Sequence, residues 1–187
     1  MKKWIKRIVL VLFGAIMLLL IIGLFLPTKF QIERKIEISA DKDSIFNYIK
    51  YLKNQNSFNV WAQMDSKMKQ KFKGTDGQVG FVSSWKSNNK QVGIGSQIIT
   101  KITPGKRIDS HLKFLVPYEN ENDAFMEVKK IAPEKTQVTW GLYGKMPYPM
   151  NVFTLFFNMD EMLGKDLESG LNNLKHQMES NSKFRNP

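Results

Sequence analysis

The chain offers few side chains that could do acid–base or metal chemistry near neutral pH. His111 and His176 are its two histidines, and it contains no cysteine. His111 alternates with Ser110 and Leu112, which predicts an outward-facing strand position, and His176 lies among charged residues of an amphipathic segment. We interpret both as solvated side chains. Without cysteine, disulfides and thiolate chemistry are excluded, and two histidines do not make a typical structural zinc site, so we expect no metal.

The sequence also lacks the usual signatures of an enzyme site. Asp160 and Glu161 are adjacent, so on a helix their side chains point about 100° apart and cannot flank one substrate bond. We expect them to stabilise the start of a helix through its dipole. No nucleophile elbow, Walker loop or dinucleotide fingerprint occurs, and Gly93 and Gly95 predict a bulge or bend within a strand. We therefore predict no catalytic residue and no cofactor.

Residues 145–162 are more suggestive, because they are rich in methionine and aromatic residues. Such side chains adapt to ligands of irregular shape. Two interpretations stay open: the segment lines the mouth of a ligand pocket, or it is a loop whose apolar residues complete the core. The residues concerned are Met146, Tyr148, Met150, Phe153, Phe156, Phe157, Met159 and Met162.

A run of apolar residues at positions 8–26 follows a basic cluster formed by Lys2, Lys3, Lys6 and Arg7. As a helix this run would be about 28 Å long, close to the hydrocarbon thickness of a bilayer. It contains no charge and consists mostly of Leu, Ile, Val and Phe, which favour insertion. We predict a single membrane span.

A cleaved signal peptide is the alternative, and two features disfavour it. The run exceeds the roughly 7–15 residues of a signal-peptide core, and no small-x-small cleavage site follows it. Moving a short tail with four positive charges across a membrane is unfavourable. We therefore expect an uncleaved anchor in the cell membrane, with the N-terminus in the cytoplasm and the domain outside it.

The net charge of +11 is spread along the chain rather than concentrated in a stripe. A nucleic-acid interface would require dense basic residues with interleaved aromatic groups, so we exclude that function. Dispersed positive charge suits solubility and attraction to anionic headgroups. The residues after the anchor suffice for one domain with its own core.

Periodicity and turn signals predict the elements of that domain. Residues 30–38 alternate as a half-buried strand, Asp41 caps a helix that reaches residue 52, and residues 54–65 are irregular. A final amphipathic helix covers residues 159–178. Between them, short dividers predict an antiparallel meander of strands near 68–74, 80–87, 91–103, 106–117, 121–132 and 135–144.

The alternation within these strands predicts one inward face, which the last helix must cover. The fold class is therefore α+β, with an antiparallel sheet packed against a long C-terminal helix. The inward residues are Trp85, Ile94, Ile98, Leu112, Phe114, Met126, Val128, Trp140 and Leu142.

Several local stretches, taken in order, are similar to a known family. They are residues 36–40, 45–46, Trp61, 80–85, 92–96, 104–108, 136–140, 158–167 and 170–174. The set resembles the START-like, or SRPBCC, superfamily of polyketide cyclase/dehydrase and lipid-transport type, in a bacterial branch with an N-terminal anchor. The resemblance covers residues 30–178. Two positions depart from it, Asp41 where proline is common and Phe58 where a second tryptophan is common, and both residues keep the local role.

The resemblance implies a helix-grip fold, in which a curved sheet wraps the long helix around an apolar cavity. We expect residues 1–29 to form the basic N-terminus and anchor, 30–178 the helix-grip domain, and 179–187 a polar tail. The expected ligand is a hydrophobic small molecule such as a lipid or isoprenoid. The candidate ligand-binding residues are Trp85, Ile98, Leu112, Phe114, Met126, Trp140, Phe153, Phe156, Met159 and Leu163.

Two other functions stay open at this stage, because the superfamily mixes binders, transporters and some enzymes. A cyclase or dehydrase acting on a polyketide-like substrate would need a polar group inside the cavity, for which Ser96, Ser110 and Tyr143 are the candidates. An envelope sensor or interaction domain would instead present an exposed face to a protein partner, which the sequence does not identify.

Overall fold

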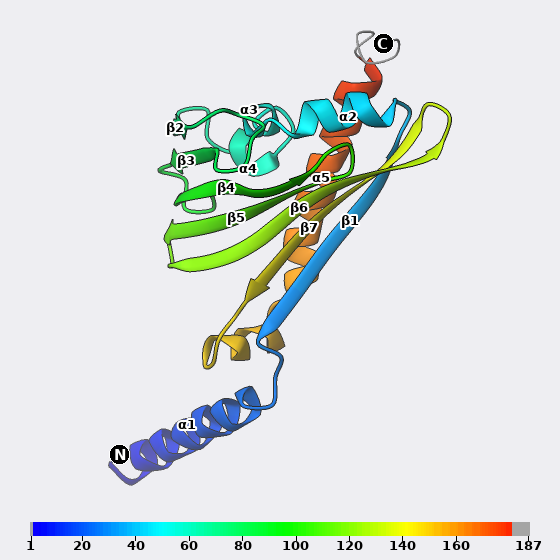
Figure 1. Cartoon of the computed structure of the whole chain (residues 1–187). Helices are drawn as coiled ribbons and strands as arrows, with labels where there is room; N and C mark the ends of the chain where they lie inside the picture. Colours follow the sequence, from blue (N-terminus) through cyan, green and yellow to red (C-terminus); the bar gives the residue numbers. More distant parts are fainter. Residues whose placement is uncertain (1, 181–187) are drawn as a thin grey trace.

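The computed structural model describes residues 2–180, which form an N-terminal helix followed by one α+β domain (Figure 1). Within these residues, seven strands make one antiparallel sheet in the order β1-β7-β6-β5-β4-β3-β2. The strands are β1 (Lys29–Ile38), β2 (Lys69–Lys73), β3 (Val82–Lys86), β4 (Ile94–Thr103), β5 (Arg107–Val116), β6 (Asn120–Ala132) and β7 (Lys135–Lys145). The predicted meander and the predicted first strand are therefore confirmed.

The helix expected over residues 41–52 is interrupted, because Tyr51 has an extended backbone. Asp41 does cap α2 (Lys42–Ile49), since its carboxylate accepts hydrogen bonds from two backbone N–H groups of the first turn. A second short helix, α3 (Leu52–Gln55), starts at once because the carboxylate of Asp76 accepts hydrogen bonds from the Leu52 and Lys53 N–H groups. The segment expected to be irregular also contains α4 (Val60–Gln63).

The last helix, α5 (Met159–Ser180), lies across the concave face of the sheet, as predicted. Gly170 permits the closest approach, because a Cβ atom there would lie 2.6 Å from a ring carbon of Trp140. At Gly164 the Arg34 guanidinium occupies the space that a side chain would take. Two glycines on one helix face thus bring the helix down onto the sheet.

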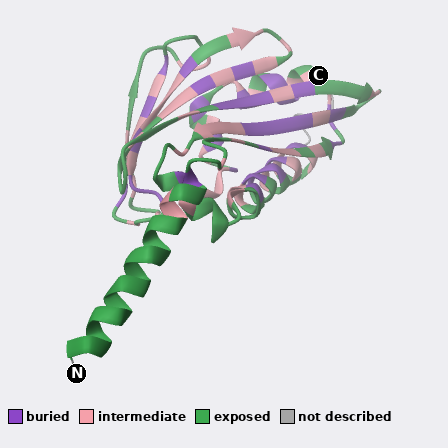
Figure 2. Ribbon diagram, turned by 90° about the horizontal axis from the view of Figure 1, so that it is seen from below, coloured by how far each residue is buried: buried purple, intermediate pink, exposed green. Residues whose placement is uncertain are grey.

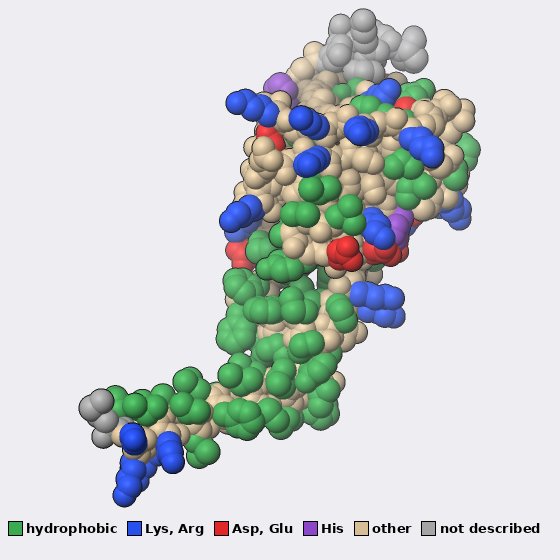
Figure 3. Space-filling view, turned by 90° about the vertical axis from the view of Figure 1, so that its left-hand side faces the viewer, with side chains coloured by type: hydrophobic (Ala, Val, Ile, Leu, Met, Phe, Trp, Pro, Cys, Tyr) green, Lys and Arg blue, Asp and Glu red, His purple; other side chains and the backbone are tan. Residues whose placement is uncertain are grey.

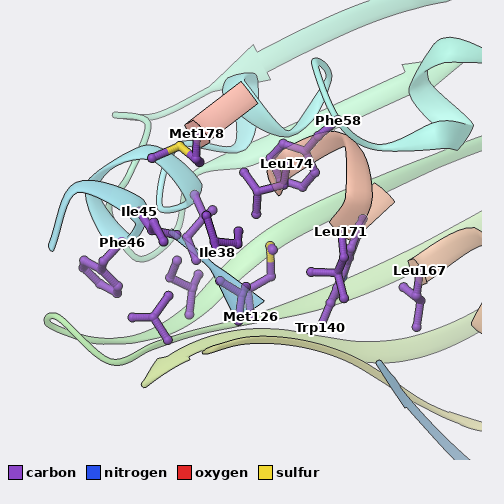
Figure 4. Close-up of a cluster of buried hydrophobic side chains, with 14 of the residues drawn as sticks. Ile38, Ile45, Phe46, Phe58, Met126, Trp140, Leu167, Leu171, Leu174 and Met178 are labelled. Carbon is purple, nitrogen blue, oxygen red and sulfur yellow. The ribbon is translucent and has the colours of Figure 1, made fainter. Parts of the chain in front are cut away.

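The packed core fills the end of the domain near α2 and the C-terminal half of α5 (Figure 4). Burial alternates along the strands, whereas almost all of the N-terminal helix is exposed (Figure 2). The core side chains labelled in Figure 4 are Ile38, Ile45, Phe46, Phe58, Met126, Trp140, Leu167, Leu171, Leu174 and Met178.

The predicted inward face is correct on β3, β5, β6 and β7 but wrong for Ile94 and Ile98 on β4. Ile94 pairs with Lys86, and Ile98 pairs with the outward-facing His111. The register shifts at Gly95, where a Cβ atom would lie 2.6 Å from the Trp85 ring, so this glycine belongs to the inner face. A register shift is therefore present at the β4 glycines, but its extra residue is Leu115 on β5. β4 itself alternates regularly from Ile94 to Ile98, so both isoleucines share the outer face.

The N-terminal helix α1 (Lys2–Gly23) projects from the domain and is long and apolar enough to cross a bilayer. This property is compatible with a membrane anchor and also with a signal sequence. At its C-terminal end α1 contacts the 3-10 helix η1 (Met150–Leu155). Of the expected polar tail, residues 179–180 still belong to α5, and residues 181–187 lie outside the described part of the chain.

Candidate functional site

A cavity of about 340 Å³ lies between the concave face of the sheet, the α3–α4 segment and the N-terminal half of α5. Sites for small molecules typically occupy about 300–1,000 Å³, so this volume suits one small ligand. The cavity exists because α5 packs tightly only in its C-terminal part. Toward Met159 its side chains are half-buried and border open space instead of the sheet.

Most of the large side chains that line the cavity are apolar, and several are aromatic. Trp85 and Phe114 meet edge to face at 5.7 Å between ring centroids, and Trp61 meets Trp140 in the same way at 6.3 Å. These contacts fix the rings and leave their faces available to a ligand. The remaining large apolar residues of the lining are Phe30, Leu52, Met68, Val92, Leu112, Leu142, Met146, Met159, Leu163 and Leu167.

Side-chain amides from α3, the loop after it and the sheet are interspersed among these apolar residues. Asn56 and Gln70 pair through two hydrogen bonds of 2.9 and 2.8 Å, which holds α3 against β2. Gln97 donates one 3.4 Å hydrogen bond to Gln55, and each of these amides has further donor and acceptor capacity. The other polar lining residues are Asn59, Ser83, Gln91, Asn120, Asn122 and Lys145.

Six of the ten predicted ligand-binding residues line this cavity together. They come from three strands and one helix that are distant in the sequence, and α5 completes the enclosure. They are Trp85, Leu112, Phe114, Trp140, Met159 and Leu163.

The other four predicted residues lie elsewhere. Ile98 is on the outer face because its neighbours Gly95 and Gln97 occupy the inward parity of β4, and Met126 is buried in the packed core beside Trp140 and Ile108. Phe153 and Phe156 follow Pro147 and Pro149 in the η1 segment, which turns them outward, with 48% and 64% of their surfaces exposed. The position of this segment near the cavity was therefore a poor guide to the direction of its side chains.

The amides are the lining residues that sequence reasoning missed. Ser83 pairs with Gln97, and Gln97 with Leu112, so these polar residues occupy inward positions of the sheet. Asn122 likewise pairs with Leu112 across β5 and β6. A polar residue in register with inward apolar ones was the available signal, and it could be used only once the β4 register was known.

The polar groups proposed for an enzymatic role do not gather in the main cavity. Ser96 pairs with Lys113 on the outer face, and Ser110 is buried beyond the cavity beside Met126. Tyr143 also faces outward, where its hydroxyl donates a 3.0 Å hydrogen bond to Glu33. Burial and the neighbouring Glu33 carboxylate raise the pKa of Tyr143.

Both histidines lie outside the cavity, with His176 exposed and His111 half-buried on the outer face of the sheet. His111 contacts Asp123 at 2.8 Å and Glu121 at 3.5 Å on the outer face of the sheet, and His176 is exposed on α5. Within residues 2–180, no group of three or more His, Asp and Glu side chains is placed to hold a metal ion.

An ion pair lies at the start of α5, next to the cavity residue Met159. The two terminal nitrogens of the Arg34 guanidinium donate hydrogen bonds to the two carboxylate oxygens of Asp160, at 3.0 and 2.9 Å. One of them also donates to the backbone carbonyl oxygen of Asp160 at 2.9 Å. The hydrogen bond from Arg34 lowers the pKa of Asp160. Deeper along α5, burial raises the pKa of Asp166, which lies beside Trp61. Asp160 thus ties the start of α5 to β1, a role that the helix-dipole prediction did not include.

No protein-family model matches the chain, and comparison with curated protein sequences finds no match. Solved structures do match. Ginseng major latex-like protein 151 from Panax ginseng is 16% identical, with a TM-score of 0.56 over 81% of this chain and 98% of that one.

Two further structures give the same result. Ara h 8.0201 is 9% identical, with a TM-score of 0.56 over 82% of this chain and 99% of that one. A protein from Thermobifida fusca is 12% identical, with a TM-score of 0.57 over 79% and 91% of the two chains. At these identities the likeness concerns the fold. The chain has the helix-grip fold that its sequence resemblance implied.

Proposed function

We propose that this protein is a membrane-tethered domain that binds one hydrophobic small molecule, such as a lipid or isoprenoid, in the cavity beneath α5. The observation that carries the proposal is the cavity of about 340 Å³. Protein interiors are normally close-packed. If the apolar residues around the cavity served only to stabilise the fold, they would be expected to pack together and leave no such space.

The lining favours a ligand that is mainly apolar and carries an uncharged polar group. Aromatic and aliphatic side chains make up most of the lining, and the amides of Gln55 and Gln97 among them can bond a hydroxyl, carbonyl or ester oxygen. Among the described residues of the lining, Lys145 is the one that carries a charge, and it is exposed at the end of β7. A charged group deep in the cavity would lose its hydration without gaining a partner of opposite charge.

The proposed tether is α1, with the N-terminus in the cytoplasm and residues 30–178 forming the domain on the other side of the cell membrane. The chain between α1 and β1 is short, and its Thr28 carbonyl accepts a 2.8 Å hydrogen bond from the N–H of Met146, a cavity residue. An apolar ligand would therefore travel only a short distance between the bilayer and the cavity.

Tryptophan fluorescence offers a direct test, since three of the four tryptophans line the cavity. The full chain carrying Trp4→Phe would be placed in nanodiscs and titrated with dibrominated stearate methyl ester, whose bromine atoms quench tryptophan on contact. We expect quenching that saturates near about one ester per chain, the capacity of a cavity this small. The unbrominated ester is the control and should not quench. Quenching that rises in proportion to the ester, without saturation, would contradict the proposal.

A further inference from the structure

The lower end of the domain carries a cluster of exposed apolar side chains around η1 and the start of α5. Between 44% and 64% of each side chain is exposed, and no charged residue occurs from position 146 to 159. Such a patch on a folded domain usually marks a surface that another apolar phase covers. We call it the apolar base: Met150, Phe153, Leu155, Phe156, Phe157 and Met162.

The apolar base is fixed to the C-terminal end of α1. The Nδ2 group of the buried Asn151 donates hydrogen bonds to the carbonyl oxygens of Gly23 at 2.7 Å and Leu26 at 3.2 Å. A Cβ atom on Gly23 would lie 2.5 Å from a methyl group of Val152, so the helix end lies directly against η1. The exposed apolar surface of α1 continues onto the base without a charged interruption (Figure 3).

Two lysines lie opposite each other at the border of this surface. Lys29 at the start of β1 lies directly opposite Lys145 at the end of β7, and both are exposed. Like charges in this cross-strand position repel each other. Phosphate groups of a membrane surface would relieve that repulsion, because lysine near an apolar surface extends its ammonium group to the headgroup level.

We propose that the apolar base is a second membrane contact, inserted into the interfacial layer of the same bilayer that α1 spans. The inference rests on the proposed function, since it takes α1 as a membrane span. The occupant is lipid rather than a protein partner because the base continues the apolar surface of α1 and ends at the paired lysines. Aromatic and methionine-rich segments of this kind favour the interface.

This contact would also set the position of the cavity. Met159, the first residue of α5, and Met146, the residue after β7, both line the cavity and border the segment that carries the base. With the base inserted, the lower end of the cavity faces lipid, so a hydrophobic molecule could enter without crossing water. Phe153 and Phe156 then serve the membrane contact rather than the cavity lining that their sequence position suggested.

The absence of cysteine makes the test clean, since single cysteines can be introduced and labelled with an environment-sensitive nitrobenzoxadiazole dye. Full-length Phe156→Cys would be reconstituted in phosphatidylcholine vesicles with and without nitroxide-labelled lipids. We expect a fluorescence loss about threefold larger than at a distal site, and stronger for shallow than for deep nitroxides, as an interfacial position requires. Phe157→Cys provides a second site in case the first variant folds poorly.

Two control positions separate the possible failures. Ile131→Cys, 40% exposed near the end of β6, is the distal site and should not be quenched. Phe13→Cys, in the middle of α1, should be quenched most by deep nitroxides if α1 spans the bilayer. Quenching at position 13 with none at 156 or 157 would overturn the membrane contact and leave the tether intact. No quenching at position 13 would overturn the tether and the contact together.

Discussion

The two halves of α5 lie on the same sheet but meet it in different ways. In the C-terminal half, Leu171, Leu174 and Met178 are 0–1% exposed and pack against strands and α2. In the N-terminal half, Met159 and Leu163 are half-buried and border the cavity. One amphipathic helix therefore has a stability-determining end and a ligand-accessible end.

The difference comes from what covers the sheet at each end. Near α2, aliphatic side chains from β1 and α2 fill the space beneath α5, including Ile38, Ile45 and Ile49, all 0% exposed. Near α3 and α4, the covering segment approaches through amide side chains such as those of Asn56 and Gln70, which pair with each other rather than fill the interior. The domain thus has a close-packed half near α2 and a hollow half, near α3 and α4, that contains the cavity.

The largest expected effect comes from shortening one leucine at each end. Leu174→Ala should lower the free energy of unfolding by about 2–5 kcal/mol, because it opens a cavity in a close-packed region. Leu163→Ala should cost about 1 kcal/mol or less, since its side chain already borders open space. Denaturant unfolding of the full chain in mild detergent measures both. Equal losses would show that the two halves do not differ in packing.

A smaller, pH-dependent effect on the stability of the fold is expected at the start of α5, where Asp160 pairs with Arg34. The pKa of Asp160 is lowered in the folded chain, so its contribution to stability is present above about pH 4, the unfolded value, and is lost on acidification below it. Asp160→Asn should therefore be less stable than the parent chain at pH 7. The difference should shrink as the pH falls from about 5 toward 3.

The effect should be modest because both partners are partly solvated. Thermal unfolding of the two chains across this pH range provides the measurement, and Asp109→Asn, whose carboxylate pairs with Arg107 away from α5, is a suitable control. A stability difference that stays constant between pH 7 and pH 3 would contradict the assigned role of the ion pair.

The same contrast explains which parts of the molecule its sequence could predict. Alternation and turn residues located every strand within a few residues, and 3–4 spacing located α5, because these signals are local. Of the residues predicted to bind a ligand, Leu112 and Phe114 on β5 line the cavity, where the apolar side chains lie mainly on one parity of the strand. On β4, apolar residues occupy both parities, so the direction of Ile98 depended on the pairing register with β3 and β5.

The cavity itself could not be predicted from the periodicity of the sequence. Met126 and Trp85 occupy equivalent inward positions in the pattern, yet the first lies in the packed core and the second lines the cavity. What separates them is the distance from α5 and α2, which depends on contacts between segments far apart in the chain. The amides of the lining were missed for the same reason, because an inward glutamine looks like an outward one until the register is known.

The central claim is that the hollow half holds a hydrophobic molecule, and native mass spectrometry of the full chain released from its own membrane tests it most directly. We predict one bound species per chain in the parent protein. It should fall about tenfold in Leu112→Trp, which fills the cavity, and persist in Leu115→Trp, an exposed position three residues further along the same strand. Bare chains for the parent protein, or the same bound species in Leu112→Trp, would contradict the account.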